Sequence, residues 1–165
     1  MTIDDVRIEK VKLEKPEDMN IIIGQSHFIK TVEDLEEALV NTVPGIKYGI
    51  GFCEASGQRL VRYAGNDSEL VDIVQRNCMN IGAGHFFMVA MKEAFPINVL
   101  RSVKSVPEVC NIYAATANPV ELIIAETELG RGILGVIDGS SPVGVEGEDD
   151  IRARIKLLRD IGYKK

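Results

Sequence analysis

The sequence predicts an α+β fold, as a single domain with about eight mostly short strands in mixed sheets and about four helices. A chain of 165 residues is the size of one ordinary domain and can bury a core of its own. Its composition, with 45% apolar and 27% charged residues, is typical of a globular protein. Strand-like and helix-like segments follow one another in no strict βαβ order, and no repeat or linker divides residues 1–165.

The first three segments predict two strands and a helix. Residues 6–12 alternate between polar and apolar side chains, and residues 19–23 form a continuous apolar run. Apolar residues then recur at helical spacing from Thr31 until the Pro-Gly pair at 44–45 stops them. Thr31 and Asp34 resemble a capping box, so a helix of about three turns is expected to begin there.

A hairpin and a second helix are expected next. Residues 48–53 and 60–63 are short β-prone runs, and the small polar segment between them is typical of a hairpin connection. Asn66 or Asp67 has the side chain of a helix N-cap, and the apolar residues that follow keep helical spacing to about residue 80.

The second half predicts further strands and two more helices. Residues 85–91 form a buried strand, and Pro96 suits the first turn of a helix that runs through Val103. Three more strands are expected at residues 109–115, 120–126 and 132–137. Four acidic residues between 146 and 150 crowd the start of a last helix, where carboxylates favour the positive end of the helix dipole. The apolar face of that helix consists of Ile151, Ile155 and Leu158.

Charge and cysteine content restrict the partners and the compartment. The net charge is -6 and no run of basic residues offsets it, which disfavours nucleic acid and anionic membranes as partners. The start of the chain resembles no signal peptide, and no apolar run is long enough to span a bilayer, so we expect a cytoplasmic protein. Cys53, Cys78 and Cys110 are odd in number and widely spaced, which favours reduced thiols buried in the core.

Several familiar motifs are absent or fail their structural context. No phosphate loop with its lysine is present, and two histidines with three scattered cysteines give no metal-ligand spacing, so no metal site is expected. Residues 130–135 match the spacing of a dinucleotide-binding motif, but that motif must begin a helix. The β-branched residues that follow predict a strand instead, and we interpret the match as chance.

The strongest local candidate is the turn Gly82-Ala83-Gly84-His85 between a helix and a strand. The glycines allow backbone N–H groups to surround a phosphate, and a neutral imidazole of His85 can accept a phosphoryl group. A purely structural interpretation is also open, because a turn that needs positive φ would select the same glycines.

Other candidates lie in loops and at strand ends. Ser26, His27 and Lys30 follow the second strand, where a histidine and a lysine reach the start of the next helix and offer donors to an anion. Asn118 offers an amide for a base edge or a ribose hydroxyl, although an Asn-Pro turn explains it equally simply. The last predicted strand lies between Arg131, a phosphate ligand, and Asp138, a carboxylate that can accept a hydroxyl proton.

Several blocks in order along nearly the whole chain are similar to those of one known family. They are residues 24–35 (GQSHFIKTVEDL), 82–85 (GAGH), 98–100 (NVL), 107–109 (PEV), 115–119 (ATANP), 130–132 (GRG) and 138–139 (DG). On these blocks the chain resembles the adenosine-specific kinase family. The resemblance implies an α+β homo-oligomer, a trimer, that binds adenosine or AMP and carries phosphate on a histidine. It identifies no cofactor and leaves the phosphoryl donor open.

The leading hypothesis is phosphoryl transfer between His85 and the 5′ oxygen of adenosine. Asp138 would act as base, and Arg131 with the amides of Gly82 and Gly84 would stabilise the transferred charge. Ser26, His27, Lys30 and Asn118 would help to position the ligand. The blocks do not say which histidine carries the phosphate, so His27 is the rival of His85. Two alternatives stay open, a non-catalytic adenosine or AMP sensor and a purely structural subunit.

Overall fold

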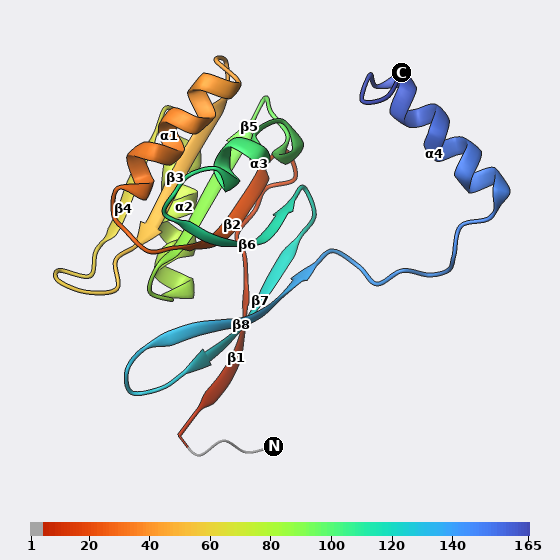
Figure 1. The fold of residues 1–165 in the computed structure, drawn as a ribbon. Helices are drawn as coiled ribbons and strands as arrows, with labels where there is room; N and C mark the ends of the chain where they lie inside the picture. The colour runs from red at the N-terminus through yellow and green to blue at the C-terminus, as the bar shows by residue number, and fades with distance from the viewer. Residues whose placement is uncertain (1–4) are drawn as a thin grey trace.

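The computed structural model describes residues 5–165, and within this range the chain forms eight strands and four helices (Figure 1). The predicted α+β class is confirmed. One sheet has five strands in the order β4 (Val61–Gly65), β3 (Lys47–Cys53), β5 (Phe86–Lys92), β2 (Asn20–Ser26) and β6 (Val109–Thr116). The other has three strands in the order β1 (Arg7–Lys12), β7 (Val120–Glu126) and β8 (Arg131–Asp138). The helices are α1 (Thr31–Thr42), α2 (Ser68–Ile81), α3 (Pro96–Lys104) and α4 (Glu148–Asp160).

Both sheets are antiparallel throughout their named strands, and not mixed as the sequence predicted. Hydrophobic periodicity identifies the residues of a strand but says nothing of the direction of its neighbours. The antiparallel order has a consequence for function. The last residues of β2 and β3 lie beside the first residues of β5 and β6, so the loops at these positions meet at one end of the sheet.

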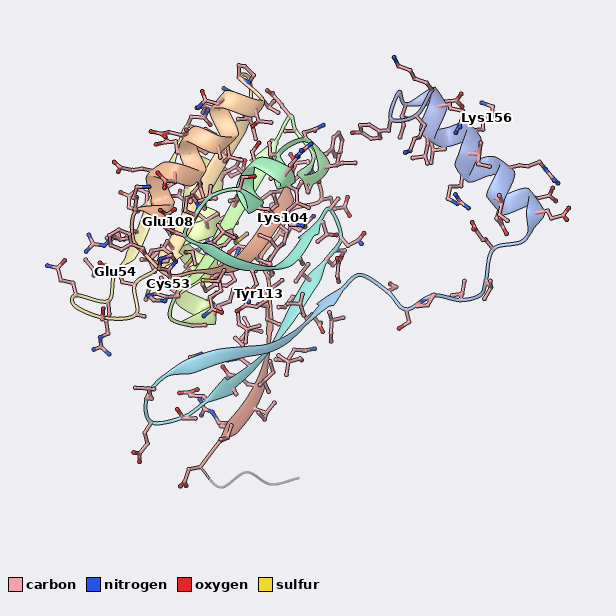
Figure 2. The ribbon with its side chains drawn as sticks, viewed as in Figure 1. Cys53, Glu54, Lys104, Glu108, Tyr113 and Lys156 are labelled. Atoms are coloured by element: carbon pink, nitrogen blue, oxygen red, sulfur yellow. The ribbon has the colours of Figure 1, made fainter. Side chains whose placement is uncertain are left out.

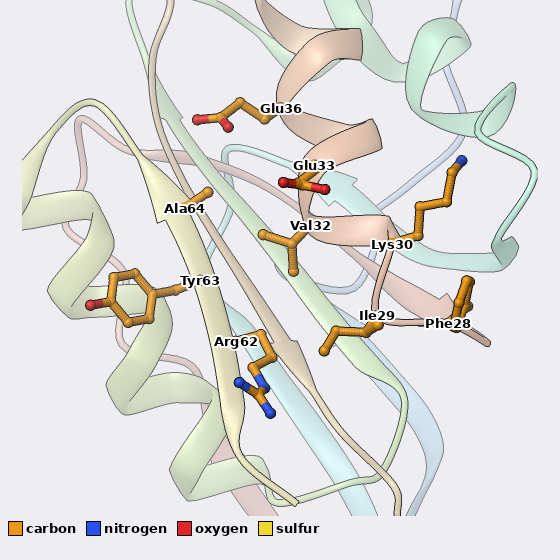
Figure 3. A pocket seen from close by; sticks show the side chains of 9 residues that line it. All are labelled: Phe28, Ile29, Lys30, Val32, Glu33, Glu36, Arg62, Tyr63 and Ala64. Atoms are coloured by element: carbon orange, nitrogen blue, oxygen red, sulfur yellow. The ribbon is translucent and has the colours of Figure 1, made fainter.

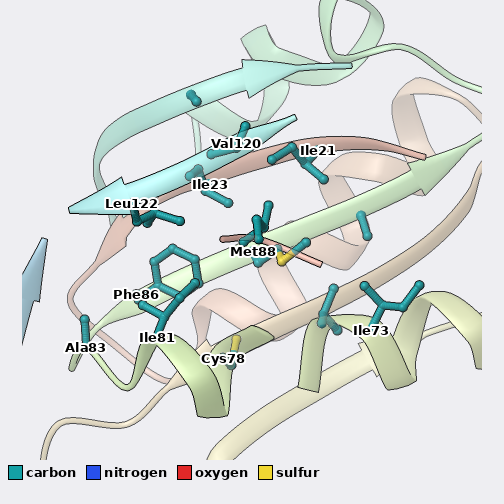
Figure 4. Close-up of a cluster of buried hydrophobic side chains, with 14 of the residues drawn as sticks. Ile21, Ile23, Ile73, Cys78, Ile81, Ala83, Phe86, Met88, Val120 and Leu122 are labelled. Carbon is teal, nitrogen blue, oxygen red and sulfur yellow. The ribbon is translucent and has the colours of Figure 1, made fainter. Parts of the chain in front are cut away.

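The five-stranded sheet is covered on both faces, and the alternation of β2 shows how. Ile21 and Ile23 pack on the side of α2 and the three-stranded sheet (Figure 4), whereas Ile22 packs on the side of α1 and α3. We call these faces the α2 side and the α1 side. All three isoleucines are fully buried, and burial of such a side chain contributes roughly 1.5–3 kcal/mol to stability.

The two predicted helix caps have different outcomes. Asp67 is the N-cap of α2, and its carboxylate accepts the N–H of Leu70 at 3.1 Å, as the sequence predicted. The capping box at Thr31 and Asp34 is wrong. The N-cap of α1 is Lys30 without a side-chain cap, because the Thr31 hydroxyl donates to the Phe28 carbonyl and Asp34 pairs with the Lys30 ammonium.

The prediction for the cysteines is correct for two of them. All three thiols are free, and Cys53 and Cys78 are buried, but Cys110 is exposed. Cys110 lies in β6, which is an edge strand of the five-stranded sheet, so several of its side chains face solvent. An apolar residue type in a strand therefore does not guarantee burial when the strand has a neighbour on one side only.

The last helix lies apart from the rest of the fold. Residues 139–147 lead away from β8 in an extended path, and α4 stands clear of both sheets at the end of it (Figure 1). No residue of α4 is buried, so the predicted apolar face is present but has no partner in the described chain. No helix within residues 5–165 is long and apolar enough to cross a membrane.

Candidate functional site

Four loops converge at one end of the five-stranded sheet, and two of them, around residues 26–30 and 82–85, are predicted site regions. They follow β2 and β3 and precede β5 and β6, as the pairings of Gln25 with Phe86 and of Ser26 with Val109 require. Figure 2 shows Cys53 and Glu54 at this end together with Glu108, which lies far from them in the sequence. We call this region the loop end of the sheet.

His85 lies in the middle of the loop end and is held by its backbone. Its N–H donates to the Cys53 carbonyl at 2.8 Å, and its carbonyl accepts the N–H of Ser26 at 3.0 Å. These bonds fix a left-handed conformation with φ of 65°, which costs a non-glycine residue about 1–2 kcal/mol. Such backbone strain is concentrated at functional sites, because only surrounding contacts can maintain it.

The His85 ring lies on the α1 side of the sheet. It stacks on Phe52, with 5.9 Å between the ring centroids and 20° between the ring planes. Phe52 belongs to the buried core on the α1 side, and its partner in β4 is Arg62. His85, immediately before β5, therefore contacts Phe52 of β3, and Phe52 is paired with Arg62 of β4.

His27, the rival histidine, is hydrogen-bonded to the segment before β6, which is the second neighbour of β2. His27 Nδ1 lies 3.0 Å from the carbonyl oxygen of Glu108, which also accepts the backbone N–H of His27 at 3.1 Å. A carbonyl oxygen only accepts, so Nδ1 must carry a hydrogen, and in the neutral ring Nε2 is then the basic nitrogen. His27 is exposed, whereas His85 is partly buried.

A charged cluster joins the start of α1 to the start of β6. The Lys30 ammonium lies 3.1 Å from Glu108 Oε1 and also pairs with Asp34. Asp34 and then Glu108 raise the pKa of Lys30, and Lys30 holds the pKa of the Asp34 carboxyl below its usual range. Lys30 therefore stays charged, but its charge is shared between two carboxylates.

Two buried oxygens beside this cluster have no hydrogen-bond partner within residues 5–165. They are Glu108 Oε2 and Ser26 Oγ, and both residues are more than nine-tenths buried. A buried carboxylate oxygen without a partner costs free energy, and native structures rarely keep one without a reason. A ligand hydroxyl or amine at this position would satisfy it.

A hollow of about 580 Å³ opens on the α1 side next to this cluster. Figure 3 shows Ile29, from the loop before α1, and Arg62, from β4, on two of its walls. Arg62 donates to Glu54 at 2.9 Å, but its buried Nε has no partner in the described part of the chain. The hollow also has apolar walls, from Phe28, Val32 and Ala64.

A second hollow, of about 760 Å³, lies on the α2 side and is lined by Gly82, Gly84 and Arg131. Gly82 ends α2 in the left-handed conformation, with φ of 62°, and a Cβ there would lie 3.3 Å from Arg131 Cδ. A backbone bridge joins Ala83 to Arg131. The structure thus brings the glycine turn and Arg131 together, but the Arg131 guanidinium is already paired with Glu9 and Glu126.

Asp138 and Asn118 lie together, at the opposite end of β8 from Arg131. Asn118 Nδ2 donates to Asp138 Oδ1 at 3.1 Å. Arg131 and Asp138 are the first and last residues of the strand, so the ordinary rise per residue separates them by roughly 20 Å. One chain does not bring Asp138 or Asn118 to the loop end.

Sequence reasoning did not single out four residues of the loop end, namely Phe52, Glu54, Arg62 and Glu108. Glu108 carried a usable signal, because it is a lone carboxylate immediately before a β-prone run, as His85 is a lone histidine before another. Arg62 carried a weaker one, as a charged residue inside the run 60–63. Their proximity depends on strand order, which the sequence does not reveal.

Comparison with known proteins identifies a family and solved structures that are similar to this chain. The family model described as adenosine specific kinase matches residues 11–164. The crystal structure of the PH1918 protein from Pyrococcus horikoshii OT3 has 50% sequence identity and a TM-score of 0.92, and the alignment covers 97% of this chain and 99% of that one. No curated protein matches the chain.

The similarity to the Pyrococcus structure extends to the C-terminal segment. Residues 139–165 make up about a sixth of the chain, and a superposition that misplaced them could not reach a TM-score of 0.92. The extended placement of α4 is therefore shared with an experimentally determined structure.

Proposed function

Because the chain belongs to the adenosine specific kinase family, we propose that it binds adenosine or AMP and transfers a phosphoryl group between a histidine and the 5′ oxygen of the nucleoside. The observation that carries the proposal is the placement of His85. Its backbone is clamped by hydrogen bonds to β2 and β3, and its ring stacks on Phe52, the strand neighbour of Arg62, whose buried Nε has no partner in the described part of the chain. A fixed imidazole on the face of the sheet that carries Arg62 supports phosphoryl transfer through histidine.

The proposed reaction has two steps. An imidazole nitrogen of His85 attacks the phosphorus of a donor, so that an N–P bond forms and the bond from phosphorus to the donor's leaving group breaks, which is an oxygen in ATP or acetyl phosphate and ammonia in phosphoramidate. The 5′ hydroxyl of adenosine then attacks the same phosphorus, the N–P bond breaks, and the hydroxyl proton passes to a base. The products are AMP and the free histidine, and AMP can reverse the second step.

The α1-side hollow is the proposed nucleoside site. It lies on the face that carries the His85 ring, and a volume of about 580 Å³ is in the usual range for small-molecule sites. Lys30 and Arg62 would hold the phosphate, and the buried oxygens of Ser26 and Glu108 would accept hydrogen bonds from the ligand. His27 would position the ligand at the rim.

The α2-side turn has a supporting role in this proposal. Gly82 and Gly84 set the path of the backbone into His85, and Arg131 braces the turn through the Ala83 bridge. Their amides and guanidinium would stabilise charge on the transferred group as it passes His85.

Asp138 and Asn118 can take part only from a second copy of the chain, because their own chain holds them at the other end of β8. We therefore keep Asp138 as the proposed base and place it in a homo-oligomer, for which the family resemblance implies a trimer. In such an assembly each site would combine the loop end of one copy with the Asp138 corner of another.

Calorimetry with AMP and adenosine tests the proposed nucleoside site. Arg62→Ala removes a cation from the α1-side hollow, and we expect the Kd for AMP to rise about tenfold or more, the value of one charge-assisted hydrogen bond. The Kd for adenosine, which lacks phosphate, should change little. Arg59→Ala is the matched control, because Arg59 lines the α2-side hollow. Equal losses of AMP affinity in both variants would place the ligand elsewhere.

The charge pairing favours a second candidate function, a non-catalytic adenosine or AMP sensor. Carboxylates pair with all three cations of the site, Lys30, Arg62 and Arg131, and so weaken the electrostatic stabilisation that these cations can give to a developing negative charge. Tight AMP binding without phosphoryl exchange under any donor would favour the sensor. Exchange between labelled AMP and the protein would exclude it.

A further inference from the structure

Helix α4 presents an apolar face that nothing in its own chain covers. Ile151, Ile155 and Leu158 recur at helical spacing, and Ile155 is 42% exposed. The segment around the helix is also apolar, since Val143, Val145 and Ile161 are all exposed. Single exposed apolar residues are ordinary, but a periodic face together with an apolar linker indicates an interaction surface.

The helix is also too short to be stable without a partner. It has 13 residues, and isolated helices of about 12–15 residues are marginal in water even when rich in alanine. Its local stabilisation comes from exposed ion pairs such as Arg154 with Glu146 and Lys156 with Asp160, and from an N-terminal cap in which Asp150 accepts the N–H of Gly147 at 2.9 Å. Exposed pairs of this kind contribute at most about 1 kcal/mol each. Most of the stability of α4 must come from packing of its apolar face.

We propose that α4 docks through Ile151, Ile155 and Leu158 on the body of a second copy of this chain. Each copy would then give one C-terminal arm, residues 139–165, and receive one. The docking is independent of the proposed phosphoryl transfer, because no residue of the arm belongs to the loop end or to either hollow.

The geometry of the arm favours a second copy over its own body as the docking surface. Residues 139–147 lead the helix away from both sheets (Figure 1). To dock on its own chain, the helix would have to return in the opposite direction. The same extended placement in the similar Pyrococcus structure shows that this path is a property of the fold. A nine-residue linker can reach at most about 30 Å, which is enough to cross to an adjacent subunit.

The body of the chain exposes the apolar surface that such an arm requires. Phe95 and Ile97 at the start of α3 are 58% and 64% exposed, and Leu134 and Ile137 of β8 are also exposed. The chain thus carries both an uncovered helix face and uncovered body surface. A second copy supplies each with an apolar partner, which is the usual route to a symmetric homo-oligomer with exchanged elements.

Mixed-isotope cross-linking identifies the docking partner directly. Equal amounts of light and heavy-isotope chain are unfolded and refolded together, and then treated with a lysine-reactive cross-linker. Lys156, Lys164 and Lys165 mark the arm, and the lysines of residues 10–104 mark the body. We expect arm-to-body links that join a light chain to a heavy one. Arm-to-body links only within one isotope form, or none at all, would overturn the proposal.

The refolding step has its own control. Links within the body must be the same in the refolded mixture as in protein that was never unfolded, which shows that the native fold has returned. In a second control, the light and heavy chains are cross-linked separately and combined afterwards. Any link between a light and a heavy chain in that mixture would be an artefact of the mass analysis.

A matched pair of substitutions in the full chain tests the helix face. Ile155→Asp adds a carboxylate to the apolar face, and Ala153→Asp adds the same carboxylate to an exposed position on another side of the same helix. We expect Ile155→Asp to abolish the arm-to-body links and the hydrogen-exchange protection of α4, and Ala153→Asp to keep both. Retention of the links by Ile155→Asp, or their equal loss from both variants, would contradict docking through this face. Unchanged exchange of β2 and β5 shows that the body stays folded.

Discussion

Replacing Gly82 with alanine tests how the glycine turn supports His85 and Arg131. Gly82 has φ of 62° and ends α2, where its N–H donates to the Cys78 carbonyl at 2.9 Å. Alanine in this left-handed conformation costs about 1–2 kcal/mol. For a chain of this length, 1 kcal/mol corresponds to a fall in Tm of about 2–4 °C.

The added methyl group has a second effect, on Arg131. It would lie 3.3 Å from Arg131 Cδ and 3.6 Å from Nε, so the arginine must move by a few tenths of an ångström. The guanidinium is held by Glu9 and Glu126, and such a shift strains both pairs. Because Arg131 is proposed to stabilise charge on the transferred group, we expect Gly82→Ala to slow phosphoryl transfer several-fold in addition to lowering stability.

Gly57→Ala is the matched control, because Gly57 has φ of 66° but has open space where its Cβ would be. Chemical denaturation of both variants gives the cost in stability, and an assay of phosphoryl transfer to adenosine gives the cost in rate. We expect similar losses of stability and a slower transfer only for Gly82→Ala. An unchanged stability of Gly82→Ala would refute the requirement for a left-handed turn, and equal transfer rates would refute the coupling to Arg131.

Three more predictions follow from the loop end and its surroundings. The Leu60 N–H and then Arg62 hold the pKa of Glu54 below its usual value of about 4.3, so the ionised carboxylate stabilises the fold fully above pH of about 4.3 and loses this effect as pH falls through the lowered pKa. The difference in unfolding free energy between wild type and Glu54→Gln should therefore shrink in acid, and a difference that stays constant down to pH of about 2 would contradict this. The bond with Cys53 and then burial raise the pKa of the Cys78 thiol, so iodoacetamide should modify exposed Cys110 in the native protein and reach Cys78 only on unfolding; mass spectrometry of the peptides decides between them. If Asp138 serves a site in another copy, mixtures of inactive Asp138→Asn and inactive His85→Asn chains should regain phosphoryl transfer, whereas activity that stays absent after verified subunit mixing would place both residues in one site or exclude Asp138.

Much of the fold was predictable because periodicity reports burial. The run at residues 120–126 matches β7 at both ends, and the helix that begins after Asp67 was placed by its cap. Strand direction was not predictable, since it depends on which runs pair in space. The capping box failed at Thr31 because Lys30 competes for the Asp34 carboxylate and so removes the group that the motif requires.

The candidate site was predictable in its parts and not in its arrangement. The sequence identified the turn that contains His85 and the loop that contains Ser26, and the antiparallel pairing of β2 and β5 explains why they meet. It joined Arg131 and Asp138 in one site because they lie at the ends of a short strand, but a strand of eight residues keeps its ends apart. Glu108 is marked in the sequence only by its place before a β-prone run, because its burial beside Lys30 depends on the pairing of β6 with β2.

The most direct test of the proposed function is to find which residue carries an acid-labile phosphoryl group. The full chain is incubated with radiolabelled ATP, acetyl phosphate and phosphoramidate in turn, and labelled peptides are mapped at alkaline pH, where phosphohistidine survives. We predict label on the peptide that contains His85, its loss from His85→Asn, and its transfer to added adenosine. Label on His27, or full labelling of His85→Asn, would contradict the account.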